Sequence, residues 1–369
     1  MLNADKTVLI TGATGRQGGA VIRHMLDKGW NLRALTRNSS TDMALNLARQ
    51  GVELAQGDLE DLASLEHAAH GVYGIYSVQN FWKVGAKREV QQGKRLADVA
   101  KKAGVEHFVF SSVGGVERNS GIGHWATKWE VEQYIRKIGL PATMIRPAAF
   151  MENYYLEQTE IGISPFTREQ ILELLQSNTS LLQGKFTDAV RADKPYQTIA
   201  VDDIGAFVAL AFDRPKEFIG QALEIAGSEL TNLQAAEVFS RVLGKPVEFQ
   251  ELPMPVVRSV LGEEYYQMYR WFNEVGFMAN ITELRRRYPE VHLHTLEEWL
   301  RSEGWHKHVR RVQAPKGEVT RKQVGMTSAP HPYKTPTTLV LYTPIQQRND
   351  WKIPLPLGLR HKPVVDLLA

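Results

Sequence analysis

The sequence predicts an α/β protein built on a doubly wound parallel sheet of the Rossmann type. Short β-branched runs alternate with amphipathic stretches up to about residue 150, which is typical of parallel βαβ units. Several amphipathic stretches end at a glycine, which favours the left-handed backbone of a helix C-terminus. A glycine-rich turn also joins the first expected strand to the first expected helix. We therefore expect a Rossmann domain over residues 1–147.

The elements of this domain follow in order along the chain. Strands are expected at Thr7–Thr11, Asn31–Thr36, Val52–Gln56, Gly74–Val78, His107–Ser111 and Ala142–Ile145. Helices are expected at Gly18–Lys28, Thr41–Gln50, Asp61–His70, Ala86–Lys102 and Thr127–Ile138.

The regular alternation stops after Pro147. Residues 148–305 are expected to form a smaller α/β subdomain that serves a substrate or partner. Its expected strands are Thr198–Val201 and Ala222–Ala226, and its expected helices are Asp202–Phe212, Leu233–Leu243, Pro255–Phe272 and His294–Glu303.

Residues 306–369 differ in composition from the rest of the chain. They hold 8 of the 17 prolines and carry 11 Lys and Arg against 3 Asp and Glu. Without apolar periodicity, this tail is expected to be disordered. A non-native extension and a basic partner-binding arm are the alternatives. The other residues carry 33 basic and 38 acidic side chains, so we expect no direct nucleic-acid binding.

Composition also excludes several classes of protein. A chain with no cysteine has no disulfide, thiolate metal site or cysteine nucleophile. No apolar run reaches the roughly 20 residues that span a bilayer, and the first residues lack the sections of a secretory signal. We expect a cytoplasmic protein without membrane contact, whose redox chemistry, if any, comes from a cofactor.

The turn after the first strand has the pattern of a phosphate-binding loop. Gly12 permits a tight turn, Gly15 lets the backbone approach a pyrophosphate, and Gly18 lets the helix pack closely on the strand. The G-x-x-G-x-x-G spacing is that of the short-chain reductase variety of the fold. A purely structural turn is the alternative. The residues assigned to cofactor binding here are Gly12, Thr14, Gly15, Arg16, Gln17 and Gly18.

The residues after the second and third strands favour NADP(H) over NAD(H). No acidic residue follows the second strand to bind a ribose 2′-hydroxyl, whereas Arg37 can grip a 2′-phosphate. Arg33 is a second candidate, or a solvated strand residue. Asp58 follows the third strand, where it either accepts from the adenine amino group or caps a helix.

Several motifs together resemble the NmrA-like family of atypical short-chain dehydrogenase/reductase relatives. They are GATGRQG after the first strand, TRN after the second, QGDLED after the third, VQNFW after the fourth, VFSSVGG after the fifth, and the later RPAAFMEN and VDDIG. The resemblance covers residues 6–305 and implies NADP(H) binding. The family includes nitrogen-metabolite regulators, redox sensors and quinone reductases. QNFW and HWATK are closest to its NADPH-sensor subgroup.

The usual catalytic pair of short-chain reductases is missing. In those enzymes a lysine acidifies a tyrosine four residues earlier on the same helix face. No tyrosine of this chain has lysine at that spacing, and His124 and Lys128 occupy it instead. His124 is a candidate proton donor or a histidine without chemistry at the entry to a helix. The resemblance implies that Lys128 lies near the nicotinamide ribose; an exposed helix lysine is the alternative.

Other polar and aromatic residues follow the fourth and fifth strands. Gln79, Asn80, Ser111 and Ser112 end strands at the carboxyl edge, where open α/β sheets bind ligands. Nearby aromatic residues either line a pocket for a flat ring or pack the core; they are Phe81, Trp82, Phe150, Tyr154 and Tyr155. No metal site is expected, because the histidine pairs His292/His294 and His306/His308 have no third ligand at a recognisable spacing.

Two functions agree with this pattern. The first is an NADP(H)-binding sensor that reports the NADPH/NADP ratio to a protein partner. Such a sensor explains why the cofactor-binding motifs are intact although the usual proton donor is altered. A reductase of quinones or similar conjugated carbonyls is the alternative, because such acceptors take a hydride without a strong protein acid.

Overall fold

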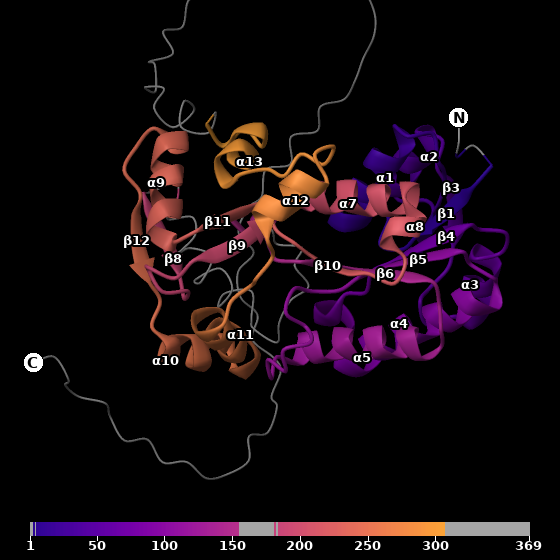
Figure 1. Ribbon diagram of the computed structural model, residues 1–369, viewed down its shortest axis with the longest axis horizontal. Coiled ribbons are helices and arrows are strands. Elements are labelled where there is room, and N and C mark those ends of the chain that lie inside the picture. Colours follow the sequence, from indigo (N-terminus) through magenta and orange to yellow (C-terminus); the bar gives the residue numbers. More distant parts are fainter. Residues whose placement is uncertain (1–2, 4, 155–180, 182–183, 307–369) are drawn as a thin grey trace, which may run out of the picture. The chain divides into compact units, whose positions relative to one another are not determined.

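A parallel sheet forms the centre of the protein. The computed structural model describes residues 3, 5–154, 181 and 184–306. The sheet has seven strands in the order β10-β6-β5-β4-β1-β2-β3 (Figure 1), and every neighbouring pair is parallel. Its strands are β1 (Thr7–Ile10), β2 (Asn31–Thr36), β3 (Glu53–Gln56), β4 (Gly74–Ser77), β5 (His107–Ser111), β6 (Ala142–Pro147) and β10 (Ala222–Ile225). The predicted doubly wound fold is confirmed.

Helices cover both faces of this sheet (Figure 1). One face carries α1 (Arg16–Leu26), α2 (Asp42–Arg49) and α7 (Val201–Asp213), and the other carries α3 (Leu62–Ala68), α4 (Phe81–Lys102) and α5 (Gly123–Lys137). The alternation of side chains along a strand produces the two layers. Val8 and Ile10 of β1 belong to the core beneath α1 and α7, whereas Leu9 belongs to the core beneath α3, α4 and α5.

Two helices start at least four residues earlier than predicted. α4 begins at Phe81 rather than Ala86, and its early break falls at Gly85, which has a φ of 77°. α5 begins at Gly123 rather than Thr127. The prediction that His124 precedes the helix was wrong, because His124 and Lys128 both lie in the first two turns of α5.

Residues beyond Pro147 complete the main sheet and also build two smaller ones. β10 is the edge strand beside β6, and α7 packs on α1, where a Cβ on Gly205 would lie only 2.6 Å from the carbonyl carbon of Ala20. The expected strand Ala222–Ala226 and helix Asp202–Phe212 thus belong to the Rossmann layers.

The smaller sheets are β11-β9-β7 and β12-β8. Their strands are β7 (Ala149–Phe150), β8 (Lys185–Asp188), β9 (Tyr196–Ile199), β11 (Ser228–Leu230) and β12 (Glu248–Glu251). The remaining helical elements are η1 (Met151–Tyr154), α8 (Pro215–Phe218), α9 (Asn232–Leu243), α10 (Met254–Val256), the π-helical turn η3 (Val257–Leu261), α11 (Glu263–Glu274), α12 (Ile281–Arg287) and α13 (Leu296–Ser302).

The tail that is expected to be disordered lies outside the described residues, apart from His306. Tyr155 and His308 also lie outside them. Within the described part of the chain, no helix has the length and apolar character needed to cross a membrane.

Candidate functional site

The three glycines of the first turn each occupy a position that a side chain would disturb. Gly12 has a φ of 60°, and a Cβ there would lie 2.8 Å from Val78 Cγ1. The Gly15 amide donates to the Gly12 carbonyl at 2.8 Å, which closes the turn. A Cβ on Gly18 would lie 2.3 Å from the same carbonyl oxygen. The close packing of α1 on the glycine turn thus depends on Gly18, as the spacing predicts.

The start of α1 is open toward the carboxyl edge of the sheet. Gly15 precedes the helix without a side-chain cap, so the first amide groups have no partner of that kind among the described residues. Gln17 turns inward instead: its Oε1 accepts from Ser111 Oγ at 2.7 Å and from Tyr76 OH at 3.1 Å. The side chains of Gln17 and Ser111 therefore hold the turn against β4 and β5. Thr14 is half-buried, and Arg16 is exposed.

Arg37 is available to an anion. Its side chain is exposed and forms no hydrogen bond or ion pair with another described residue. The loop that carries it is fixed: the Asn38 carbonyl accepts from Thr36 Oγ1 at 3.1 Å, and Asn38 Oδ1 accepts from the Ser40 amide at 2.9 Å. A guanidinium on a fixed loop without an internal partner fits a phosphate.

Arg33, the second candidate for this role, is engaged elsewhere. Its Nη1 donates to the carbonyls of Ala68 at 2.8 Å and His70 at 2.9 Å, and its Nε pairs with Glu53 at 2.9 Å. Arg33 therefore holds β2 to β3 and to the end of α3.

Asp58 is not a helix cap. Its Oδ1 accepts from the Glu60 amide at 2.8 Å within the turn after β3, whereas Asp61 caps α3 by accepting from the Ala63 amide at 3.1 Å. The adenine contact proposed for Asp58 stays a prediction.

The carboxyl edge also holds two buried polar atoms without partners. Gln79 donates through Nε2 to Ser77 Oγ at 2.9 Å, but its Oε1 is buried and unbonded within the described residues, as is Ser112 Oγ. Such orphaned groups cost stability unless a ligand or water satisfies them. Asn80 differs, because its Oδ1 caps α4 by accepting from the Lys83 amide at 3.2 Å. Among the described residues, this edge thus offers two unbonded polar groups, an unpaired arginine and a helix start without a side-chain cap. Together these groups fit a phosphate-bearing cofactor.

Lys128 is paired with a carboxylate that the sequence analysis missed. Its Nζ donates to Glu89 Oε1 at 3.1 Å, and Thr127 Oγ1 donates to the other oxygen of Glu89. Glu89 is only 1% exposed and the Lys128 side chain 15%. The pair holds the half-buried lysine in place and leaves two of its N–H groups for a ligand. The partners are 39 positions apart in the sequence, so no local motif could have revealed the pair.

A second missed carboxylate, Glu264 of α11, holds His124. Glu264 Oε1 accepts from the His124 ring Nδ1 at 2.6 Å and from its amide at 2.9 Å, and Oε2 accepts from the Gly123 amide at 3.2 Å. Burial acts to raise the pKa of Glu264, but these bonds lower it overall. Glu264 therefore caps α5 as an anion and fixes the orientation of the imidazole.

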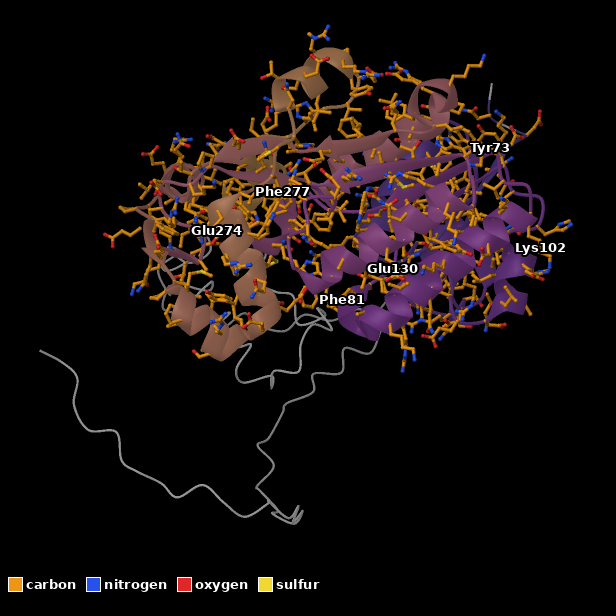
Figure 2. All side chains as sticks on the ribbon, turned by 60° about the horizontal axis from the view of Figure 1, so that its bottom comes forward. Tyr73, Phe81, Lys102, Glu130, Glu274 and Phe277 are labelled. Atoms are coloured by element: carbon orange, nitrogen blue, oxygen red, sulfur yellow. The ribbon has the colours of Figure 1, made fainter. Side chains whose placement is uncertain are left out.

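Aromatic rings surround the same histidine. The centroid of His124 lies 5.6 Å from that of Phe81 and 5.0 Å from that of Trp82, and Trp82 stacks on Tyr265 at 5.2 Å. Phe81 lies at the end of the α4–α5 layer nearest α11 (Figure 2). Phe81 and Trp82 thus pack on the candidate proton donor. That they line a pocket for a flat ring together with Phe150 and Tyr154 stays a prediction.

The histidine pair His292/His294 is engaged in contacts of its own. His294 Nδ1 lies 2.5 Å from Asp203 Oδ1, and the His294 amide donates to Asp203 Oδ2 at 2.9 Å. In the part of the chain that the structure describes, no three His, Cys, Asp or Glu side chains are grouped to hold a metal ion.

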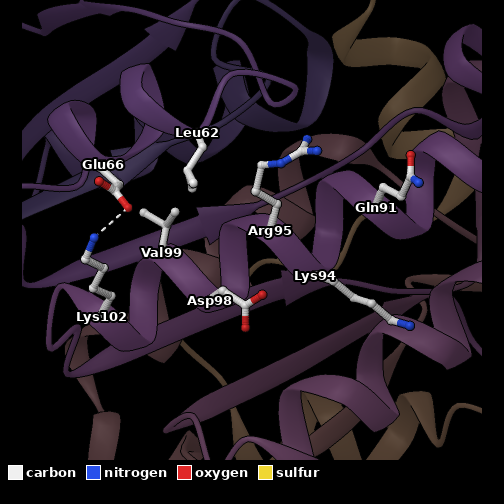
Figure 3. Close-up of a pocket in the computed structure, with 8 residues that line it drawn as sticks. All are labelled: Leu62, Glu66, Gln91, Lys94, Arg95, Asp98, Val99 and Lys102. Atoms are coloured by element: carbon white, nitrogen blue, oxygen red, sulfur yellow. Dashed lines mark hydrogen bonds and ion pairs between the residues drawn. The ribbon is translucent and has the colours of Figure 1, made fainter.

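A surface groove of about 450 Å³ lies away from these residues, between α3 and α4 (Figure 3). Leu62 and Val99 provide its apolar lining, and Glu66 and Lys102 pair across it at 2.8 Å. None of the predicted site residues lines the groove.

The chain is similar to known proteins over most of its length. The model of the NmrA-like family matches residues 4–300. An NmrA-like family domain-containing protein of Dictyostelium discoideum is 29% identical over 291 residues, which cover 74% of this chain and 89% of that protein.

Two solved structures are similar in fold. NADPH-dependent quinone oxidoreductase QOR2 of Escherichia coli, complexed with NADPH, has a TM-score of 0.66 and 23% identity, over 80% of this chain and 99% of that one. NmrA, a negative transcriptional regulator in complex with NADP, has a TM-score of 0.61 and 23% identity, over 85% and 99%. One is an oxidoreductase and the other a regulator, so the shared fold does not select between the two functions.

Proposed function

Because this chain belongs to the NmrA-like family, we propose that it binds NADP(H) in the cytoplasm and reports the NADPH/NADP ratio to a protein partner. The start of α1 would hold the pyrophosphate, and Arg37 the 2′-phosphate. Lys128 would bond the nicotinamide ribose, and Gln79 and Ser112 would offer their unbonded atoms near the nicotinamide. The bound cofactor, as NADPH, is a source of hydride.

The observation that carries the sensor proposal is the contact between α5 and α11. Glu264 accepts three hydrogen bonds from the first two residues of α5, four residues before Lys128. Through these bonds a change at the nicotinamide end of the site would reach α11, a helix of the expected partner-facing part 148–305. A sensor also requires that the two cofactor forms stabilise two protein states unequally, since tight binding alone shifts no equilibrium.

The test is hydrogen exchange of α11 in the presence of saturating NADPH or NADP. We expect the amides of Glu263–Glu274 to differ in protection between the two forms. In Glu264→Gln, the difference should shrink while both forms still bind. Glu274→Gln is the matched control, because Glu274 lies at the far end of the same helix. Identical exchange with both cofactor forms would refute the sensor proposal.

A reductase is the second candidate, and the same hydrogen bond favours it. A carboxylate bonded to Nδ1 fixes the tautomer of His124 and leaves Nε2 to exchange a proton with a substrate. The measurement is steady oxidation of NADPH with a panel of quinones. Turnover at about 1 s⁻¹ or more, the low end of ordinary enzymes, would replace the sensor proposal with this one. His124→Ala should then lower activity and change its pH dependence.

A further inference from the structure

A tyrosine that the proposed function does not use lies at the centre of the main sheet. Tyr76 belongs to β4, next to β1, and it is fully buried in the core beneath α1 and α7. The strand order reverses between β4 and β1, which makes this the switch point where open α/β sheets bind ligands. The Thr11 amide donates to the Tyr76 carbonyl at 3.0 Å, so β4 is fixed beside the start of the glycine turn.

The phenol of Tyr76 reaches the first turn of α1. Its OH donates to Gln17 Oε1 at 3.1 Å, and Ser111 Oγ donates to the same oxygen at 2.7 Å. Burial raises the pKa of Tyr76, so this hydroxyl stays protonated and remains a donor. Two neighbouring strands, β4 and β5, thus supply two donors to one side-chain oxygen of the helix.

These two bonds decide which end of the Gln17 amide is left for a ligand. Oε1 is directed at β4 and β5, so Nε2, on the other side of the amide carbon, is directed away from them. Within the described residues Nε2 donates to no acceptor, and Gln17 is only half-buried. An amide oxygen only accepts hydrogen bonds, and an amide nitrogen only donates them. Gln17 therefore offers two N–H donors in the first turn of α1.

We propose that Tyr76 is a positioning residue for the cofactor, because it makes Gln17 a hydrogen-bond donor at the start of α1. The inference rests on the proposed function, which places the pyrophosphate at this helix start. Phosphate oxygens accept hydrogen bonds, so they are bound by the Nε2 end of the amide and repelled by the Oε1 end. Without Tyr76, Ser111 is the one remaining anchor of the amide, and the amide can turn about it. Tyr76 acts through Gln17 and not on the cofactor, because none of its own surface is exposed.

The first test removes the phenol hydroxyl and keeps the ring. Tyr76→Phe should weaken NADPH binding about five- to tenfold in titration calorimetry, the effect of about one hydrogen bond. Binding of adenosine 2′-monophosphate, which carries the 2′-phosphate but no pyrophosphate, should stay nearly unchanged. Tyr73→Phe is the matched control, because it also loses a phenol hydroxyl but Tyr73 precedes β4 at the opposite, amino end of the strand.

The second test asks whether Tyr76 acts through Gln17. Gln17→Met removes both ends of the amide, so adding Tyr76→Phe to it should cause no further loss of NADPH affinity. A separate role of Tyr76 in the fold would instead cost the same affinity with and without Gln17→Met. Gln17→Glu keeps an acceptor for both hydroxyls but replaces the N–H donors by a second oxygen. It should therefore weaken NADPH binding more than Tyr76→Phe does.

The outcomes separate this inference from the function on which it rests. An unchanged NADPH affinity in Tyr76→Phe or Gln17→Glu, equal losses with and without Gln17→Met, or equal losses for NADPH and adenosine 2′-monophosphate would overturn the role of Tyr76 alone. Loss of NADPH affinity in Tyr73→Phe would overturn it as well. An unmodified protein that binds no NADPH would instead refute the proposed function, and the inference with it.

Discussion

Individual side chains set the cofactor preference that we expect. Arg37→Ala should remove most of the preference for NADP(H) over NAD(H), about 1.5–3 kcal/mol for a charged hydrogen bond. The four affinities are measured by titration. Arg49→Ala is the matched control, because Arg49 is exposed at the end of α2 and forms no contact to the site. An unmodified protein that binds NADPH and NADH equally would contradict the assignment of Arg37.

The pair of Lys128 and Glu89 is expected to act as a unit. Glu89→Gln leaves the half-buried lysine without its anion, and breaking such a pair costs about 3–5 kcal/mol of the free energy of unfolding. It should also weaken NADPH binding by misplacing Lys128. The double variant Glu89→Gln/Lys128→Met removes both charges, so we expect it to be more stable than Glu89→Gln alone. Additive losses in denaturant titrations of Glu89→Gln, Lys128→Met and the double variant would show that the two residues do not cooperate.

Asp188 makes a pH-dependent contribution to stability. Burial raises its pKa to about 6 from 3.8, so between these values the folded protein holds a proton that the unfolded chain has released. Its stabilising contribution is complete below about pH 4 and is lost as the pH rises through 6. Asp188→Asn lacks this loss. Relative to the unmodified protein, the variant should therefore gain about 1–3 kcal/mol between pH 4 and 7 in denaturant titrations. A pH-independent difference would contradict the shift.

At the scale of elements, two adjacent glycines of α1 should behave oppositely. A Cβ on Gly18 would meet the Gly12 carbonyl oxygen at 2.3 Å, whereas the nearest atom to a Cβ on Gly19 is 3.7 Å away. Gly18→Ala should lose about 1–3 kcal/mol of the free energy of unfolding through overpacking, together with cofactor affinity. Gly19→Ala should gain up to about 1 kcal/mol, because alanine favours the helix. Equal melting temperatures of the two variants would show that the turn relaxes freely.

The elements also show what the sequence could and could not predict. β1 and the turn at Gly12 were predictable because apolar alternation and glycine spacing are local signals. The place of β10 was not, because nothing in Ala222–Ile225 indicates that it pairs with β6 rather than with a nearer strand. Glu89 and Glu264 were missed for the same reason: each meets its partner through packing of one helix on another, 39 and 140 residues apart in the sequence.

Two long-range contacts connect the residues before Pro147 to the residues after it. α1 and α7 join residues before and after Pro147 through Asp202, which accepts from Arg23 at 2.8 Å and contacts His24 at 2.9 Å. α5 and α11 join them again through Glu264. The Rossmann layers and the later elements are therefore expected to unfold as one cooperative unit, rather than as separate domains divided at residue 147.

Deletion of residues 314–369 tests how far this unit extends. The last described elements already close a core, in which Leu300 and Trp305 are buried. The residues after them hold frequent prolines and no apolar periodicity, so they have little to add to a packed core. We expect the shortened chain to keep its NADPH affinity and its main thermal transition within about 2 °C, which corresponds to less than about 1 kcal/mol for a protein of this size. A larger loss would place part of the tail in the folded unit, whereas loss of a partner alone would identify it as a binding arm.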